Sequence, residues 1–380
     1  MRIALLTDGI QPYVMGGMQK HSFYIAKYLA LSRVEVDLYH TTAGPDSNIE
    51  KLEVFTAEER KMIHSIVVPF PTSIKIPGHY IRNSHRYSEL LYEELCKRPP
   101  VDFIYVKGLS GWKLMEEKSK GKSFPPIGVK FHGMNMFQKP PSRKGHLEQF
   151  LFRGPVRFNM RHADYVFSYG GKITEIIHQQ GIARDKIIDL PTGIEAARIA
   201  ASVTEHHQPL KFLYIGRYER LKGVEELSKA IEELSSSLSF EFHFVGPIPE
   251  HLRVQSDRVK YWGKISDPNE MLKVVQGCDV LLCPSYSEGM PNVIIEAMAQ
   301  GLAIIATDVG AVQCLVSEKN GWLIEQCTVQ GIKQAMEEAV AKKEAELTQL
   351  KKYSLEKTGQ ELVWENIAVQ LKEILTTLVK

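Results

Sequence analysis

The sequence predicts an α/β protein built from two doubly wound parallel sheets. Short β-branched and aliphatic runs alternate with longer amphipathic stretches along the chain, a pattern that is typical of βαβ units. The alternation pauses at 195–209 and then restarts. The chain has 380 residues, 44% of them hydrophobic, which is enough for two or three compact units. We therefore expect two domains joined by a short linker.

The expected elements follow from hydrophobic periodicity. In the first domain the predicted strands are 3–7, 34–40, 66–68, 103–106, 127–131, 165–168 and 187–190, and the clearest helices are 18–31, 85–96 and 172–180. In the second domain the predicted strands are 211–215, 240–245, 280–283 and 303–307, and the helices are 224–235, 269–277 and 292–300. From residue 328 onward the chain is expected to be helical. The stretch 362–378 carries an apolar stripe that should dock on the first domain.

Composition excludes several classes of protein. Charged residues make up 24% of the chain, which argues against a disordered or low-complexity protein. No stretch approaches the roughly 18 to 20 apolar residues of a membrane-spanning helix, and Asp8 interrupts the first apolar run too early for a signal peptide. The five cysteines show no Cys-x-x-Cys spacing, so we expect neither a disulfide framework nor a zinc site. A cytoplasmic location fits best.

Charge is distributed unevenly along the chain. Residues 1–200 hold 28 Lys and Arg against 20 Asp and Glu, whereas the remainder carries a net negative charge. The segment 139–161 is basic and aromatic, which suits an anionic membrane surface, a phosphorylated or acidic acceptor, or simply a solvated helix. No nucleic-acid-binding module is present, so we expect no nucleic acid partner.

Paired glycines follow the first predicted strand. Gly16 and Gly17 precede the helix at 18–31, where the backbone can approach a ligand and the helix start offers free N–H groups to an anion. The spacing is not Gly-x-Gly-x-x-Gly, so a nicotinamide or flavin site is not favoured. The loop is a candidate for binding an anion or a sugar, and the alternative is a flexible turn.

A histidine stands at the end of the predicted strand 127–131. His132 lies between Phe131 and Gly133, and side chains at the carboxyl ends of strands point into the crevice where open α/β sheets bind ligands. A lone histidine is usually structural. The position makes His132 a candidate site residue.

Two cations lie in the loop after the first strand of the second domain. Arg217 follows Gly216, and Lys222 precedes Gly223. An arginine fork and a lysine point charge can together grip a diphosphate. The alternative is a pair of solvated loop cations.

The segment 284–301 carries the strongest signal. Pro291 opens a helix whose free N–H groups suit a phosphate, and Gly301 closes it. Glu296, about one turn along, can accept hydrogen bonds from ribose hydroxyls, and Glu288 in the loop can reach a polar group beside the phosphate. The candidate donor-binding residues here are Gly289, Met290, Pro291, Asn292, Val293 and Glu296.

Glu288 and Glu296, with seven residues between them, resemble the nucleotide-sugar motif of retaining glycosyltransferases of family 4, which have the two-domain GT-B fold. The resemblance covers nearly the whole chain. The other segments that carry it are Gly16-Gly17, Phe131-His132-Gly133, Gly216-Arg217, Lys222-Gly223, Phe244-Val245-Gly246, Tyr261-Trp262-Gly263 and Trp364 with Ala368.

The resemblance implies two Rossmann-like domains facing across a cleft. The acceptor-side domain would be 1–200 and the nucleotide-sugar domain 201–358, with a helix at 359–380 that packs back on the first domain. The implied reaction moves a sugar from a UDP-, GDP- or ADP-sugar to a glycan or lipid-linked acceptor, with retention and without cofactor or metal.

The resemblance also implies roles for single residues. Arg217, Lys222 and the helix start at Asn292 and Val293 would hold the leaving diphosphate. Glu296 would hold the ribose and Glu288 the donor sugar or phosphate, while His132 would contact the transferring sugar. The expected catalytic residues are therefore His132, Arg217, Lys222 and Glu288, and the nucleobase is expected near Trp262, Lys264 and Ile265.

Two departures from the family pattern stand out. The chain reads Thr192-Gly193-Ile194-Glu195 where the family often has Asn-Gly-(Val/Ile)-Asp, and it reads Gly246-Pro247-Ile248-Pro249 in place of the more frequent Gly-x-Gly. The second departure leaves sugar-nucleotide selectivity unreadable at that loop.

The function predicted from the sequence is a hexosyltransferase-type retaining glycosyltransferase of cell-envelope polysaccharide, lipopolysaccharide or glycolipid assembly. It would act in the cytoplasm, or at the inner face of the plasma membrane if the basic segment binds lipid. The alternatives are a nucleotide-sugar epimerase with the same fold and a non-catalytic subunit that binds sugar nucleotides. A nicotinamide dehydrogenase ranks last because its glycine fingerprint is missing.

Overall fold

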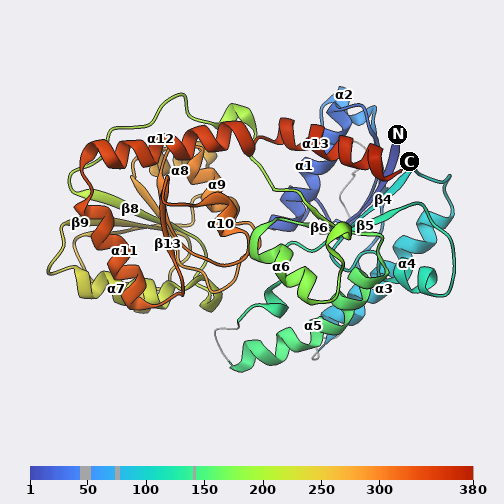
Figure 1. Ribbon diagram of the computed structural model, residues 1–380, viewed down its shortest axis with the longest axis horizontal. Coiled ribbons are helices and arrows are strands. Elements are labelled where there is room, and N and C mark those ends of the chain that lie inside the picture. The colour runs from blue at the N-terminus through green and yellow to red at the C-terminus, as the bar shows by residue number, and fades with distance from the viewer. Residues whose placement is uncertain (43–52, 73–77, 140–142, 380) are drawn as a thin grey trace. The chain divides into compact units, whose positions relative to one another are not determined.

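The computed structural model describes residues 1–42, 53–72, 78–139 and 143–379, and only the backbone for 143–148. The chain forms two compact units (Figure 1). Unit 1 comprises Met1–Phe137, Lys144–Thr192 and Trp364–Lys380, and unit 2 comprises Gln138–Arg143 and Gly193–Val363. The sequence analysis placed the boundaries at 200/201 and 358/359.

Unit 1 contains a parallel sheet of seven strands in the order β3-β2-β1-β4-β5-β6-β7. The strands are β1 (Arg2–Leu6), β2 (Glu35–His40), β3 (Ile63–Val67), β4 (Phe103–Lys107), β5 (Ile127–Lys130), β6 (Tyr165–Ser168) and β7 (Ile187–Asp189). The helices are α1 (Gly17–Leu31), α2 (Ala57–Arg60), α3 (His79–Cys96), α4 (Trp112–Ser119), α5 (Arg143–His162), α6 (Gly171–Gln179) and α13 (Trp364–Leu378). The strand order reverses between β1 and β4, so the topological switch point of this sheet lies there.

Unit 2 contains a parallel sheet of six strands in the order β10-β9-β8-β11-β12-β13. The strands are β8 (Leu210–Ile215), β9 (Phe240–Val245), β10 (Val259–Gly263), β11 (Val280–Cys283), β12 (Ala303–Thr307) and β13 (Gly321–Ile324). The helices are α7 (Val224–Leu234), α8 (Pro268–Gln276), α9 (Asn292–Met298), α10 (Val312–Leu315), α11 (Val329–Ala341) and α12 (Glu344–Glu361). Its switch point lies between β8 and β11. The predicted doubly wound architecture is confirmed for both units.

Burial explains why the central strands read as continuous apolar runs. Every residue of β4 and of β12 is buried, as expected for parallel strands with both faces covered. The strands β3 and β10 lie at sheet edges and are only partly buried. The polar residues that follow the central strands lie beyond the carboxyl ends of those strands, where the chain leaves the core.

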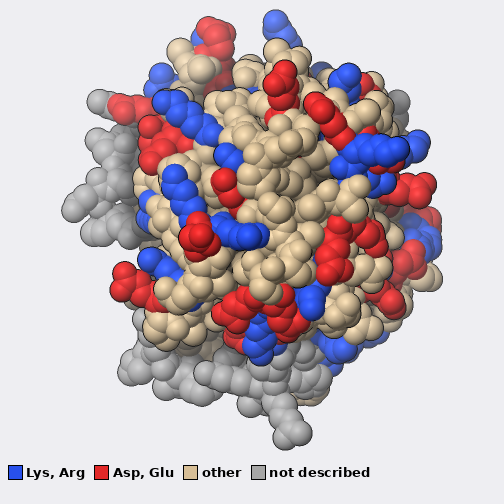
Figure 2. All heavy atoms as spheres, turned by 90° about the vertical axis from the view of Figure 1, so that its left-hand side faces the viewer, with Lys and Arg blue, Asp and Glu red and all other residues tan. Residues whose placement is uncertain are grey.

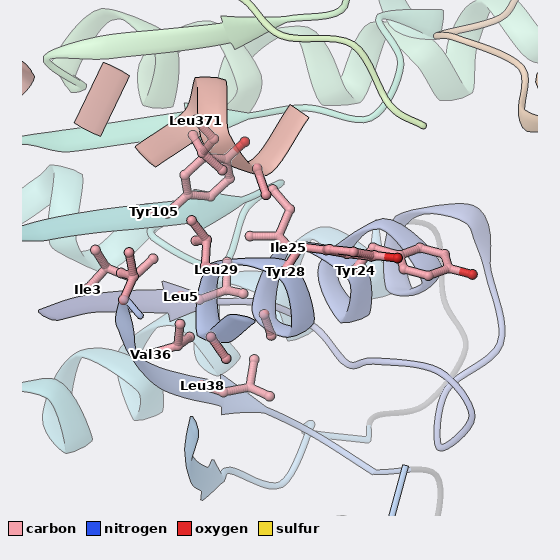
Figure 3. Packing of buried hydrophobic residues seen from close by; sticks show 14 of the residues in the cluster. Ile3, Leu5, Tyr24, Ile25, Tyr28, Leu29, Val36, Leu38, Tyr105 and Leu371 are labelled. Atoms are coloured by element: carbon pink, nitrogen blue, oxygen red, sulfur yellow. The ribbon is translucent and has the colours of Figure 1, made fainter. Parts of the chain in front are cut away.

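The helix α13 completes the core of unit 1. Trp364 is 1% exposed and stacks on two rings of α1, with centroid distances of 5.3 Å to Tyr24 and 6.2 Å to Tyr28. Figure 3 shows Leu371 of α13 together with Tyr105 of β4 in the same cluster. The expected return of the C-terminal helix to the first domain is confirmed.

The sequence analysis did not predict two of the strands, and before the last helix it left the C-terminal helical region undivided. β10 and β13 are short edge strands whose sequences mix apolar residues with lysine, tryptophan and glycine, so neither shows the β-branched run that marked the edge strands β3 and β7. After residue 328 the chain forms three helices, which are separated at 342–343 and 362–363.

Figure 2 shows how charged side chains are distributed on one face of the molecule. On the face shown in Figure 2, acidic and basic side chains are interspersed. No large area of one sign is visible there, so this face offers no broad electrostatic footprint to a charged partner.

Candidate active site

The loops that follow β8 and β11 are held together at the switch point of the second sheet. The Tyr286 amide donates a hydrogen bond to the Leu221 carbonyl oxygen over 2.8 Å. Gly223 has a φ of +67°, and a Cβ atom there would lie 2.0 Å from the Pro284 carbonyl oxygen. Only glycine fits such a close approach of two backbones. The loops carrying Lys222 and Glu288 are therefore fixed against each other by main-chain contacts.

Lys222 and Glu288 form an ion pair at this point. Lys222 Nζ donates to Glu288 Oε1 over 2.6 Å, and the Ser285 hydroxyl donates to the same oxygen over 2.6 Å. The Lys222 side chain is 33% exposed and that of Glu288 only 10%. Burial lowers the pKa of Lys222, but the nearby Glu288 carboxylate outweighs that effect and the pKa is raised. Lys222 therefore keeps its positive charge at neutral pH.

Two further glycines bring backbone against backbone around this pair. A Cβ atom at Gly246 would lie 1.9 Å from the Gly216 carbonyl oxygen, and one at Gly310 would lie 2.2 Å from the Glu288 carbonyl oxygen. Both glycines have positive φ, +133° and +58°. Gly246 and Gly310 have no room for a side chain. The backbones at Gly216 and Glu288, both in predicted site loops, are therefore in close contact with the neighbouring backbone.

The two arginines of the first loop have different surroundings. Arg217, a predicted site residue, is 75% exposed and pairs with Glu219 at 3.1 Å. Arg220 instead holds Glu226 of α7 through both terminal nitrogens, at 2.8 and 2.6 Å, and donates to the Tyr286 hydroxyl. The sequence analysis missed this bidentate pair because a loop arginine and a helix glutamate look like ordinary solvated charges.

The remaining predicted donor residues lie on and before α9. Met290 and Pro291 are buried, while Gly289, Asn292, Val293 and Glu296 are half-buried. Pro291 is the residue before the first helical residue, so the predicted helix start is found one residue later, at Asn292. Glu296 lies about one turn along the helix, as its spacing predicted.

The predicted nucleobase residues lie at the end of β10, an edge strand separated from β8 by β9. Trp262 is half-buried, Lys260 Nζ lies 3.6 Å from the centre of its ring, and its indole nitrogen has no hydrogen-bond partner in the described part of the chain. Lys264 is exposed and Ile265 half-buried. The structure does not place any of the three in contact with the Lys222–Glu288 pair.

In unit 1, the predicted His132 lies just after β5. Its Nδ1 atom is 2.7 Å from the Tyr169 hydroxyl. Burial and two nearby lysines hold the pKa of His132 well below its usual range, so the ring is neutral. Lys130 Nζ lies 3.8 Å from the centre of the Tyr169 ring and donates to the Leu190 carbonyl oxygen.

A second polar group of unit 1 was not predicted as a site. Asp8 follows β1, Lys107 ends β4, and both border the same cavity as His132. Lys107 Nζ lies 3.0 Å from His21 Nδ1, and Gln19 donates to Asp8 Oδ1 over 3.0 Å. Burial lowers the pKa of Lys107 to about 7 and raises that of Asp8 to about 6. The reasoning that singled out His132, a polar residue at the end of a buried strand, also applies to these two.

The predicted glycine loop leads into α1. Gly16 is the residue before the helix and Gly17 begins it. A Cβ atom at Gly16 would lie 2.1 Å from Gln19 Oε1, so the glycine leaves room for the side chain that holds Asp8. The loop thus lies beside the cavity of unit 1.

The basic segment forms α5, and its arginines bond within unit 1. Arg153 donates to the Met136 carbonyl oxygen over 2.7 Å, and Arg157 binds the Gln180 side chain at 2.8 Å. Phe150 is 61% exposed. The side chains of Arg143 and Lys144 lie outside the described residues. Across the described parts of the chain, no helix is both long and apolar enough to cross a membrane.

Two family models match the chain. Residues 15–198 match the model described as Glycosyltransferase Family 4, and residues 209–342 match the model described as Glycosyl transferases group 1. The two sheets and their loops define a protein with the GT-B fold. The chain belongs to the family 4 glycosyltransferases, as its glutamate motif predicted.

Several curated relatives are similar over part of their length. The putative teichuronic acid biosynthesis glycosyltransferase TuaC of Bacillus subtilis is 34% identical over 39% of this chain and 40% of its own. The putative colanic acid biosynthesis glycosyltransferase WcaL of Escherichia coli is 23% identical over 53% of this chain and 54% of its own. The chain thus spans about half the length of the curated relatives it matches.

Solved structures resemble the whole chain. Sucrose-phosphate synthase from Thermosynechococcus elongatus has a TM-score of 0.77 and 19% identity, and the match covers 99% of this chain and 98% of that one. Anabaena HepE in complex with UDP and glucose has a TM-score of 0.67 and 18% identity, with 99% and 100% covered. At these identities the likeness shows the shared fold.

Proposed function

We propose that this protein is a retaining glycosyltransferase that moves a sugar from a nucleoside-diphosphate sugar to an acceptor hydroxyl. The observation that carries the proposal is the Lys222–Glu288 pair at the switch point of the second sheet, the place where open α/β folds bind nucleotides. The structural neighbour with bound UDP and glucose supports a nucleotide donor. The relatives of teichuronic and colanic acid biosynthesis support a role in cell-envelope polysaccharide, lipopolysaccharide or glycolipid assembly.

Lys222 is proposed to stabilise the leaving diphosphate. An ammonium has three donors, and Glu288 takes one of them, so others remain for phosphate oxygens. A positive charge that is fixed before the reaction lowers the barrier most where negative charge grows. The exposed Arg217 can add a planar, two-pronged contact from the same loop.

Glu296 is proposed to hold the ribose, and Glu288 the donor sugar or phosphate. Glu288 suits a positioning role because two donors, Lys222 and Ser285, already fix one of its oxygens. The other oxygen remains for a sugar hydroxyl. The proposed contact of His132 with the transferring sugar stays a prediction, as does transfer without a metal ion.

A thermal-shift screen of nucleoside diphosphates and nucleotide sugars tests the donor site, because a ligand that binds only the folded protein raises its melting temperature. We expect one base family to raise the melting temperature, and Glu296→Ala to abolish the shift. Glu337→Ala, at an exposed position of α11, is the matched control and should keep it. The absence of any nucleotide-dependent shift would contradict the proposal.

Product analysis tests the chemistry. With the donor identified, we expect transfer to an acceptor with the anomeric configuration of the donor, unchanged by a chelator. Conversion of the donor without acceptor would indicate an epimerase, and donor binding without any turnover would indicate a non-catalytic subunit. An inverted product, measured by nuclear magnetic resonance (NMR), would overturn the retaining mechanism.

Contact with an anionic membrane through 139–161 is also part of the proposal. It is supported by the exposed Lys139 and Phe150 and by Leu151, which is 44% exposed. Co-sedimentation with vesicles should require anionic lipid and weaken in Phe150→Ser. Binding that is indifferent to anionic lipid would remove this part alone.

A further inference from the structure

A cavity of about 370 Å³ lies at the switch point of the first sheet, and unit 1 alone forms it. Asp8 after β1, Lys107 at the end of β4 and His132 after β5 all border it. Ligand pockets typically measure roughly 300–1,000 Å³, so this one has room for a small ligand such as a sugar ring. It is therefore a binding site by position and by size.

The polar groups that border the cavity keep free hydrogen-bonding capacity. Gln19 occupies Asp8 Oδ1, which leaves Oδ2 without a side-chain partner among the described residues. Tyr169 occupies His132 Nδ1, which leaves Nε2 of the neutral ring. An ionised carboxylate only accepts hydrogen bonds, so a ligand that binds Asp8 must supply a donor such as a hydroxyl group.

The described residues that line the cavity are close to neutral in total charge. Asp8 and Lys107 are the only acidic and basic residues other than His132 among its described lining residues. Arg153, Arg157 and Arg161 of α5 are not among these described residues, although Phe152 and Val156 of the same helix are. A carboxylate or phosphate on the ligand would be repelled by the Asp8 carboxylate in a poorly solvated space, and Lys107, whose pKa falls to about 7, offsets that repulsion only in part. The cavity therefore favours an uncharged ligand.

Aromatic rings form much of the remaining wall. The ring centroids of Phe70 and Tyr80 are 6.4 Å apart, those of Tyr80 and Phe152 are 6.0 Å apart, and Phe131 also borders the space. Ring faces are electron-rich and attract C–H groups that carry partial positive charge. A pyranose has apolar C–H faces and a rim of hydroxyls, which matches such a wall combined with a single carboxylate.

We infer that this cavity binds an uncharged sugar ring of the acceptor and that Asp8 accepts a hydrogen bond from one of its hydroxyls. Asp8 is thus a specificity-determining residue that selects neutral over anionic acceptor sugars. This inference rests on the proposed function, since it names the acceptor of the same reaction.

Equilibrium binding to the full chain without donor tests it. The probes are methyl glycosides of neutral hexoses, each paired with the uronic acid and the 6-phosphate of the same sugar, followed by saturation-transfer NMR and calorimetry. We expect at least one neutral sugar to bind about tenfold more tightly than both charged counterparts, and Asp8→Asn to weaken it about tenfold. Asp185→Asn, at an exposed position of the same unit, should leave the affinity unchanged.

The pH profile separates a direct contact from a structural role. The titratable groups that face Asp8 are Lys107 of β4, with His21 behind it, and Tyr80 and Tyr87 of α3. The Asp8 pKa is about 6, so affinity for the neutral sugar should fall about tenfold on going from about pH 7 to about pH 5, as the carboxylate is protonated. Asp8→Asn should flatten this profile.

Three results would overturn the inference: tighter binding of a charged analogue, unchanged affinity in Asp8→Asn, or no binding of any neutral sugar. Nucleotide binding to the same preparations tells the two proposals apart. If nucleotides still raise the melting temperature, only the cavity inference fails. If they do not, the proposed function fails as well.

Discussion

Each of the two sheets presents a lysine at its switch point, and the two lysines behave in opposite ways. Lys222 lies 2.6 Å from a carboxylate oxygen, is one-third exposed and has a raised pKa. Lys107 is fully buried, lies 3.0 Å from a neutral imidazole, and its pKa falls to about 7 because of burial. The same topology thus supports a lysine that keeps its charge in one unit and a lysine that loses its charge near neutral pH in the other.

The difference lies in the partner and in access to water. A carboxylate at contact distance offsets the cost of removing an ammonium from water, whereas an imidazole nitrogen accepts one hydrogen bond without adding opposite charge. A fixed cation suits a ligand that gains negative charge. A cavity shielded from water suits a ligand that carries no charge.

The largest expected effect concerns turnover. Lys222→Met should lower kcat about 10²- to 10³-fold, because it removes a cation aimed at developing negative charge and leaves Glu288 without its partner. Steady-state kinetics with the cognate donor measure this effect. Lys229→Met, at an exposed position of α7, should keep full turnover. If Lys222→Met also kept full turnover, the role proposed for the Lys222 charge would be wrong.

The next effect tests the backbone contacts that hold the charged site. Gly223→Ala should lower the free energy of unfolding by at least about 3 kcal/mol, because the new Cβ meets the Pro284 carbonyl oxygen. Gly263 provides a matched control, since its φ of +66° is nearly the same but nothing lies within 4 Å of its Cβ position. Gly263→Ala should cost only about 1 kcal/mol, the strain of a left-handed alanine. Equal losses in thermal or urea unfolding would show that main-chain crowding does not hold the site.

The smallest effect is a dependence of stability on pH. Folded Lys107 has a pKa of about 7, far below that of an unfolded lysine. Above pH 7 the unfolded state therefore binds more protons, and stability should rise by about 1–2 kcal/mol between about pH 7 and about pH 9. Lys107→Met should remove this rise and be more stable than the native protein at neutral pH.

Urea unfolding across that pH range measures the effect. Lys186→Met, at an exposed position of unit 1, should keep the native slope. If Lys107→Met kept the native dependence of unfolding free energy on pH, the pH dependence would not come from titration of Lys107.

The fold could be predicted from the sequence where burial is complete. Strands such as β4 and β12, buried on both sides, appear as uninterrupted apolar runs. The edge strands β10 and β13 were missed because lysine, tryptophan and glycine interrupt their short apolar patterns, whereas isoleucines still marked strands at the edges β3 and β7.

The candidate site was predictable to the extent that it follows local spacing. Lys222 and Glu288 lie in the loops that follow β8 and β11, and His132 follows β5, so the rule that ligands bind beyond the carboxyl ends of strands identified them. The roles of Asp8, His21 and Arg220 depend on partners distant in sequence, and no spacing within one loop reveals those partners.

The helix α13 gives synthesis of this protein an unusual order of events. Trp364 packs against His21, Tyr24 and Tyr28 of α1, yet it is translated after every residue of unit 2. A nascent chain would therefore carry a first unit with an open apolar face while the second unit, whose segments are contiguous except for Gln138–Arg143, completes its own core. Premature termination before α13 would release a chain with Lys222 in place and unit 1 unfinished, a natural substrate for chaperones or proteases.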